Sequence, residues 1–141
     1  MKQEFCFARI EVRPSKIHRW GVFALEKIPR GRKVIEYTGE AVSRREGKRR
    51  SESTEIHCLF TIDKYWYLDG AVDGSGAEFI NHSCEPNLES RNINRRIYYY
   101  SVRDLAAGDE LLVDYHFGKD QEKVRCSCGA AKCRGYINVL E

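Results

Sequence analysis

The sequence predicts a single, mostly-β domain, and three observations support that prediction. The chain has 141 residues, the size of one ordinary domain. Short runs of β-branched and aromatic residues recur along it, separated by turns that contain Gly or Pro. A single segment has the features of a helix longer than two turns. Because 42% of the residues are hydrophobic, such a chain can bury a real core.

Strands are predicted for most of the first 40 residues. The apolar residues Phe5, Phe7, Ile10 and Val12 indicate short strands near the N-terminus. The following segment, 18–40, has the pattern of strand, turn and strand. The Pro-Arg-Gly sequence at 29–31 makes the turn, and a glycine at position 39 ends the second strand.

A helix is predicted for residues 43–53, with Ser43 as its N-cap and Glu46 completing a capping box. Its first turns are strongly basic and contain Arg44, Arg45, Lys48, Arg49 and Arg50. These cations could contact nucleic acid or an acidic partner. We favour a solvated helix face instead, because Glu46 and Glu52 offset part of the charge. The formal net charge is only +3, whereas nucleic-acid-binding domains usually have a stronger basic bias.

The second half of the chain alternates strands with turns. The predicted strands lie within 57–68, at 97–102, and after a turn within 105–115. A loop is expected at 69–76, a short helix at 77–81 and a polar turn at 81–87. The C-terminal remainder is expected to be loop.

No segment indicates a membrane or an export signal. No apolar run approaches the roughly 18–20 residues of a membrane-spanning helix. The N-terminal residues lack the apolar centre of a signal peptide. We therefore expect a soluble, intracellular protein with no membrane contact.

Three of the six cysteines crowd near the C-terminus, where Cys126, Cys128 and Cys133 form the pattern C-x-C-x4-C. Zinc takes four tetrahedral ligands and binds thiolates well, so this spacing favours a metal site. The alternatives are free thiols or a disulfide. From spacing alone, the candidates for a fourth ligand are Cys6, Cys58, Cys84, His82 and His116.

Two further strings are ambiguous when each is taken alone. The string NHSCEPN at 81–87 concentrates hydrogen-bonding side chains around a proline, as an ordinary capped turn does. The string LLVDYHF at 111–117 places Tyr115 just after an apolar strand, where a core tyrosine with a satisfied hydroxyl is the ordinary reading.

Taken together and in order, five strings resemble the SET family of protein-lysine methyltransferases. They are KIHRWGVFA (16–24), EYTGE (36–40), FINHSCEPN (79–87), GDELLVDY (108–115) and CSCGAAKCRG (126–135). The resemblance implies a mostly-β fold of several small sheets, with a C-terminal pseudoknot that joins the NHSC and DY segments. It also implies a SET domain over residues 1–118 and a zinc-binding post-SET tail over 119–141.

The resemblance assigns the metal ligands. It implies that Cys84 joins Cys126, Cys128 and Cys133 around one structural zinc ion. Cys6 and Cys58 are then left as ordinary core or surface thiols.

The resemblance also assigns a binding site for S-adenosylmethionine. Residues that match the family's cofactor contacts are Arg19, Trp20, Gly21, Trp66, Asn81, His82 and Tyr115. Arg19, Trp20 and Gly21 are expected to hold the methionine end, largely through their backbone. Asn81 and His82 are expected to bind the amino-acid and adenine parts. Tyr115 and Tyr37 are the expected catalytic tyrosines.

This chain departs from the family pattern at three positions. It has Arg19 and Glu78 where the family commonly has Gly and Arg, and Ser75 where Asn is frequent. Glu78 inverts a charge near the expected cofactor. Val113 and Ser90 stand where other members have tyrosines that limit methylation, so di- or trimethylation is expected.

The implied function is methyl transfer from S-adenosylmethionine to a lysine side chain of a protein substrate, such as a histone tail. The alternative is a catalytically inactive SET-like module that binds peptide or nucleic acid. A zinc-knuckle nucleic-acid protein would leave the NHSC and DY segments unexplained. The expected location is the nucleus or chromosome of a eukaryote, or the cytoplasm of a bacterium.

Overall fold

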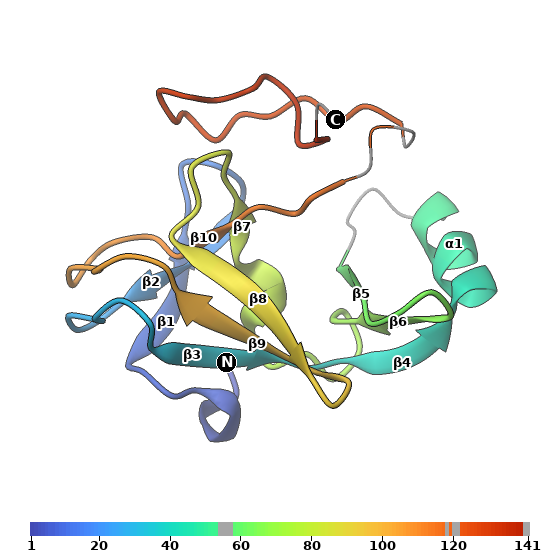
Figure 1. Cartoon of the computed structure of the whole chain (residues 1–141), viewed down its shortest axis with the longest axis horizontal. Helices are drawn as coiled ribbons and strands as arrows, with labels where there is room; N and C mark the ends of the chain where they lie inside the picture. The colour runs from blue at the N-terminus through green and yellow to red at the C-terminus, as the bar shows by residue number, and fades with distance from the viewer. Residues whose placement is uncertain (54–57, 118, 120–121, 140–141) are drawn as a thin grey trace.

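Figure 1 shows the computed structural model of the chain, which describes residues 1–53, 58–117, 119 and 122–139. The mostly-β prediction is confirmed, because strands in three small sheets dominate these residues. The one α-helix of the described segments is α1 (Arg44–Glu52). In the same segments, no helix is long and apolar enough to cross a membrane.

The three sheets differ in size and order. A two-stranded sheet pairs β1 (Ile10–Pro14) with β2 (Trp20–Ala24). A three-stranded sheet has the order β4 (Glu40–Ser43), β6 (Trp66–Asp69), β5 (Leu59–Thr61). The five-stranded sheet has the order β3 (Lys33–Tyr37), β9 (Arg96–Ser101), β8 (Leu88–Ile93), β10 (Leu112–Val113), β7 (Asn81–His82). Two 3-10 helices, η1 (Gln3–Phe5) and η2 (Ala77–Phe79), complete the elements.

The predicted helix forms with Ser43 as its N-cap, but the Glu46 side chain pairs with arginines of the helix instead of completing the predicted capping box. Ser43 Oγ accepts the backbone N–H of Glu46 at 3.2 Å. The Glu46 side chain pairs with Arg49 and Arg50, and Arg50 also pairs with Asp69 at 2.8 Å. Two of the five cations of α1 are therefore compensated by carboxylates, as expected of a solvated helix face.

Other local predictions were wrong. The N-terminal strand at Phe5 and Phe7 is replaced by η1, after which the Phe7 N–H donates to the Val34 carbonyl at 2.8 Å. Strand β8 was not predicted, because only Leu88 of its six residues is buried and the apolar alternation is missing. Strand β7 lies inside the predicted polar turn. The predicted start of a strand at residue 57 lies outside the described residues.

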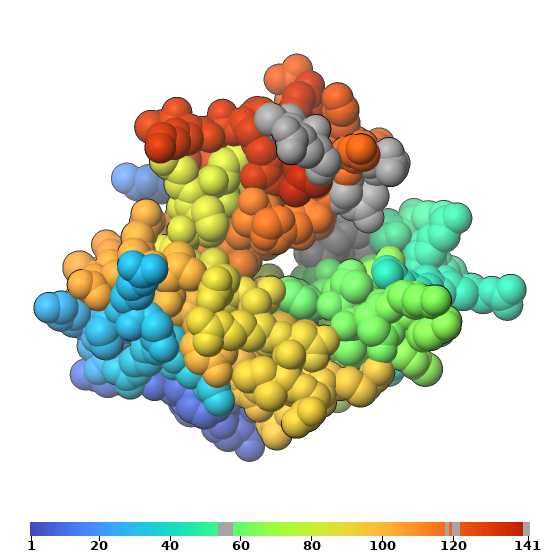
Figure 2. Space-filling model, in the orientation of Figure 1, coloured from blue at the N-terminus to red at the C-terminus, as the bar shows by residue number. Residues whose placement is uncertain are grey.

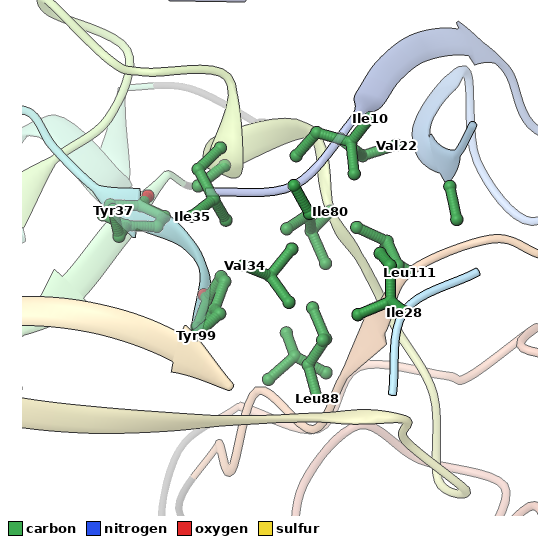
Figure 3. Packing of buried hydrophobic residues seen from close by; sticks show 14 of the residues in the cluster. Ile10, Val22, Ile28, Val34, Ile35, Tyr37, Ile80, Leu88, Tyr99 and Leu111 are labelled. Atoms are coloured by element: carbon green, nitrogen blue, oxygen red, sulfur yellow. The ribbon is translucent and has the colours of Figure 1, made fainter. Parts of the chain in front are cut away.

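The core lies between the two-stranded sheet and the five-stranded sheet. Figure 3 shows side chains from β1, β2, β3 and β8 converging there with Ile80 and Leu111. Branched aliphatic side chains from several distant segments fill most of this space, and Tyr37 and Tyr99 border it. Val22, Ile28, Val34, Ile35 and Leu111 are fully buried. This packing fixes the positions of the chain segments that border the site.

The short strand β10 joins segments that are far apart in the sequence. It pairs in parallel with β7, so that Leu112 lies opposite Asn81 and Val113 lies opposite His82. Val113 also pairs with Leu88 of β8 on its other side. This pairing places the NHSC and DY segments side by side, as the pseudoknot of the SET family predicts.

The C-terminal residues form a separate layer over the sheets. In Figure 2 this tail, red and orange, lies over the yellow and green parts of the chain. Phe117 forms a bridge with Asn138, and the Val139 N–H donates to the Phe117 carbonyl at 2.8 Å. The expected boundary between residues 118 and 119 falls at a position outside the described residues, so the division into 1–118 and 119–141 stays a prediction.

The core makes a direct prediction about stability. Replacing Leu111 with Ala removes a fully buried side chain and should lower the free energy of unfolding by about 2–5 kcal/mol. Ile93→Ala is the control, because Ile93 is 44% exposed and its loss should cost no more than about 0.5 kcal/mol. Urea denaturation of both variants tests this, and equal losses would contradict the assigned core.

Candidate active site

A cavity of about 520 Å³ lies between the sheets and the C-terminal tail. Five segments contribute its walls: the β1–β2 loop, the residue before β5, the residues around β7, the segment after β10 and the tail. The lining residues include Ile17, His18, Arg19, Trp20, Cys58, Glu78, Phe79, Asn81, His82, Tyr115, Phe117, Val124, Cys126, Cys128 and Ile137. Residues from positions 17 to 137 of the chain therefore meet around one space.

The structure brings most of the predicted site residues together. Arg19, Trp20, Asn81, His82 and Tyr115 all line the cavity. Arg19 has a φ of +33°, a backbone region that favours glycine, which fits the glycine common at this position in the family.

Other predicted site residues lie behind the wall or away from it. Gly21 follows the lining loop, and the Tyr37 hydroxyl donates to the carbonyl of Cys58, whose residue lines the cavity. Trp66 lies on β6 opposite Ser43 and is not among the described lining residues. Val113 is buried in the core and Ser90 is exposed on β8, so neither lines the described cavity.

Asn81 anchors the cavity's β1–β2 loop through its side-chain amide. Its Nδ2 lies 2.9 Å from both the Trp20 carbonyl and Glu110 Oε2, and 3.2 Å from Ser15 Oγ. The same Nδ2 is 3.3 Å from the His18 carbonyl. Because an amide NH₂ has only two protons, these acceptors share it. One buried side chain therefore sets the shape of the loop.

Glu110 is the residue that sequence reasoning missed in this network. The Ser15 hydroxyl lies 3.0 Å from both Glu110 carboxylate oxygens and donates to that carboxylate. Glu110 precedes two apolar strand residues, and nothing in the string GDELLVDY indicates that it reaches a loop 95 residues earlier. A Cβ on Gly21 would lie only 2.5 Å from Glu110 Oε2, so this approach requires glycine.

Tyr115 is held at both its backbone and its hydroxyl. Its hydroxyl donates to the Ile80 carbonyl at 2.6 Å, and its backbone N–H donates to His82 Nδ1 at 3.1 Å. The rings of Tyr115 and His82 meet edge to face with centroids 5.3 Å apart. Burial of the hydroxyl, together with the nearby Cys58 and Glu110, raises the pKa of Tyr115 well above its ordinary value. The phenol is therefore protonated at neutral pH.

His82 is neutral at physiological pH and its tautomer is fixed. Burial lowers its pKa to about 4, although Asp114 opposes that shift. Since Nδ1 accepts the Tyr115 N–H, the ring proton lies on Nε2. Nε2 is 3.6 Å from Cys84 Sγ, so the imidazole links the Tyr115 segment to the cysteine cluster.

Four thiols gather beside the cavity and could hold a metal ion. The sulfur atoms of Cys84, Cys126, Cys128 and Cys133 all lie within 4.8 Å of one another. Cys84 Sγ is 3.8 Å from Cys126 Sγ and 3.9 Å from Cys133 Sγ. Sulfurs at the corners of a tetrahedron around zinc, with bonds of about 2.3 Å, are about 3.8 Å apart. The geometry therefore fits a zinc ion.

The backbone around the four thiols also fits a set of thiolates. The N–H groups of Arg134, Cys128 and Gly135 each point at a cysteine sulfur, at 3.4 Å. Burial alone would raise the pKa of Cys128, but hydrogen bonds from the backbone and the neighbouring thiols lower it to about 6, whereas burial raises the pKa of Cys84 and that of Cys126 in the absence of a metal ion. Cys6 and Cys58 lie outside this cluster, and so does His116.

Glu78 places a carboxylate on the cavity wall. Its Oε1 accepts the Gly76 N–H at 2.7 Å, and no cation pairs with it among the described residues. A Cβ on Gly74 would lie 2.1 Å from the Gly70 carbonyl oxygen and 2.5 Å from both Glu78 carboxylate oxygens, so this turn leaves no space for a side chain there. The hydroxyl of Ser75 donates to the Glu36 carbonyl at 2.6 Å and holds this turn in the interior.

The close approach of Gly21 and Glu110 can be tested by a double-mutant cycle. Gly21→Ala should lower the free energy of unfolding by about 1–3 kcal/mol, because the new methyl group overlaps the Glu110 carboxylate. In a Glu110→Ala background the same substitution should cost less, since the overlapping group is gone. Urea denaturation of the four proteins measures the coupling. If Gly21→Ala cost the same free energy of unfolding in both backgrounds, the Glu110 carboxylate would not be what excludes a side chain at position 21.

Comparisons with known proteins agree on one family. The sequence pattern of the SET domain matches residues 19–116. The chain is 42% identical over 134 residues to "Histone-lysine N-methyltransferase, H3 lysine-4 specific" of Schizosaccharomyces pombe, covering 89% of this chain and 15% of that protein. It is 37% identical over 149 residues to the protein of the same name from Saccharomyces cerevisiae, covering 97% of this chain and 13% of that protein.

A third relative extends the likeness to an animal. The chain is 35% identical over 133 residues to "Histone-lysine N-methyltransferase set-2" of Caenorhabditis elegans, covering 88% of this chain and 9% of that protein. The chain thus spans only a small part of the length of the relatives it matches. With the SET-domain pattern over most of the chain and this level of identity, the chain belongs to the SET-domain family.

Proposed function

We propose that this chain is a protein-lysine methyltransferase domain that transfers methyl groups from S-adenosylmethionine to a lysine of a histone tail. The observation that carries the proposal is the cavity in which Tyr115, Asn81 and His82 meet the β1–β2 loop beside a four-cysteine cluster. The relatives' names direct the first test to histone H3 and its lysine 4. Such a substrate places the protein on chromatin in a nucleus.

S-adenosylmethionine supplies a methyl group that is already activated on a sulfonium. In the proposed site, the backbone of Arg19, Trp20 and Gly21 holds the methionine end. Asn81 maintains that loop, because its side-chain amide is committed to the Trp20 carbonyl and Glu110. Glu78 lines the cavity together with the cations Arg19 and Arg125, so its walls carry charges of both signs.

The substrate lysine must arrive without its proton. A free lysine side chain has a pKa of about 10.4, so nearly all of it is protonated at neutral pH. Burial among apolar side chains lowers that pKa, because the charged amine loses its hydration. Tyr115 and Phe117 provide aromatic walls, with ring centroids 5.7 Å apart.

Tyr115 acts by position rather than as a general base. Its phenol keeps its proton at neutral pH, and its hydroxyl is fixed on the Ile80 carbonyl at 2.6 Å. The fixed hydroxyl and ring align the incoming amine with the methyl group. Such alignment removes a large part of the activation barrier of a bimolecular transfer. Tyr37 supports this site from behind through its hydrogen bond to the Cys58 carbonyl.

Zinc is the proposed metal of the cysteine cluster, with Cys84, Cys126, Cys128 and Cys133 as its ligands. A closed set of four thiolates is a structural site, because no ligand position is left for substrate. Its role is to hold the tail against β7, and the tail forms one wall of the cavity.

Methyl transfer should be measured first by mass spectrometry. The zinc-loaded protein, S-adenosylmethionine and histone H3 should yield methylated lysine, and the spectra also report whether mono-, di- or trimethyl-lysine forms. Tyr115→Phe keeps the ring but loses the hydrogen bond to Ile80, and the rate should fall on the order of 100-fold. Cys6→Ser, outside the cavity, is the matched control. Transfer that is undiminished in Tyr115→Phe would remove this tyrosine from the proposed site.

Zinc content is a separate prediction. Cys84→Ser should lower the zinc retained after dialysis well below one ion per chain, because a closed site has lost one of its four ligands. Cys6→Ser should retain the full ion, since Cys6 lies outside the cluster. Elemental mass spectrometry of both proteins decides this. Full retention of zinc by Cys84→Ser would exclude Cys84 as a ligand.

A further inference from the structure

A partly buried ion pair joins the C-terminal tail to the segment that carries Tyr115. Arg134 lies directly after Cys133, and Asp114 directly precedes Tyr115. The two terminal guanidinium nitrogens of Arg134 donate to the two carboxylate oxygens of Asp114 at 2.8 and 3.0 Å. The side chains are only 15% and 14% exposed, so solvent screens this bidentate contact weakly.

The rest of the guanidinium holds the tail itself. Arg134 Nε donates to the Asn138 carbonyl at 2.9 Å, and a terminal nitrogen donates to the Ile137 carbonyl. Ile137 lines the cavity. One planar group thus connects Asp114 with the backbone of a cavity wall, and only arginine offers enough donors in a fixed arrangement to do so.

Asp114 is also held by contacts with its own chain segment and with β7. Its Oδ1 accepts the His116 backbone N–H at 2.8 Å, and the same oxygen is 3.6 Å from His82 Nδ1. His116 has a φ of +52°, so the chain turns sharply after Tyr115. Asp114 therefore shapes the backbone on both sides of the tyrosine whose N–H binds His82.

Few contacts attach the C-terminal tail to the rest of the domain. It has no helix or regular strand among its described residues, and it reaches the body of the domain mainly through Cys84, Phe117 and Asp114. The thiols hold one part of the tail. The ion pair holds the stretch around Ile137 that faces the cavity.

We infer that Arg134 is a positioning residue: through Asp114 it locks the cavity wall of the tail against the Tyr115 segment and so sets the affinity for the cavity's ligand. That the ligand is S-adenosylmethionine or its product rests on the proposed function. Loss of such a supporting contact is expected to weaken binding by roughly 10- to 100-fold.

The test combines ligand binding, zinc content and hydrogen exchange in three variants. Arg134→Gln removes the charge, Arg134→Lys keeps the charge without the planar fork, and Arg96→Gln is the control. Arg96 also forms an ion pair, with Glu36 at 2.8 Å, but it lies on β9 and does not line the cavity. Calorimetry with S-adenosylhomocysteine gives the dissociation constant, and elemental mass spectrometry gives the zinc content.

The expected result is a dissociation constant raised about 10- to 100-fold in Arg134→Gln, a smaller rise in Arg134→Lys and none in Arg96→Gln. Zinc should stay at the wild-type level in all three. An unchanged affinity in Arg134→Gln overturns the inference. Loss of zinc from that variant also overturns it, because Arg134 would then act through the metal site.

Amide hydrogen exchange decides the inference without any ligand. In the zinc-loaded protein, Arg134→Gln should accelerate exchange in residues 113–117 and 136–139 together, whereas Arg96→Gln should not. Unchanged exchange rates in those two segments would contradict the positioning role of Arg134. If the wild-type protein binds no S-adenosylhomocysteine, the proposed function fails, and the exchange measurement alone still judges the role of Arg134.

Discussion

The parallel pairing of β10 with β7 is the constraint on which the rest of this site depends. Two residue pairs, Leu112 with Asn81 and Val113 with His82, bring together segments that lie about thirty residues apart. In this register, Tyr115 forms hydrogen bonds with His82 and the Ile80 carbonyl, and Asp114 pairs with Arg134 of the tail. A shift by one residue would turn Val113 out of the core and move Tyr115 away from the cavity.

The cavity is closed by a tail that has little secondary structure of its own. Its shape depends on four thiols, one partly buried ion pair and a few backbone hydrogen bonds. A metal bound by the thiols couples its binding energy to folding of this wall. The ion pair of Arg134 with Asp114 adds a second attachment for the stretch around Ile137. Strands β1, β2, β3 and β8, by contrast, are held by core packing (Figure 3).

The polar groups of the site keep defined protonation states. His82 is neutral because burial lowers its pKa, and Tyr115 keeps its proton because burial raises its pKa. Charged side chains of both signs line the cavity, with the carboxylate of Glu78 and the guanidinium groups of Arg19 and Arg125.

The sequence by itself determined the fold class, the capped helix at Ser43 and the family, because turn residues, caps and contiguous motifs are local signals. It also pointed to Asn81, His82, Tyr115 and the cysteines, whose motifs are short and intact. Strand β8, with a single buried residue, gave no local signal. Only the tertiary structure decided the contacts of Glu110 and the partnership of Arg134 with Asp114. Those contacts span up to 95 residues, and their geometry is set by strand register and core packing rather than by neighbouring residues.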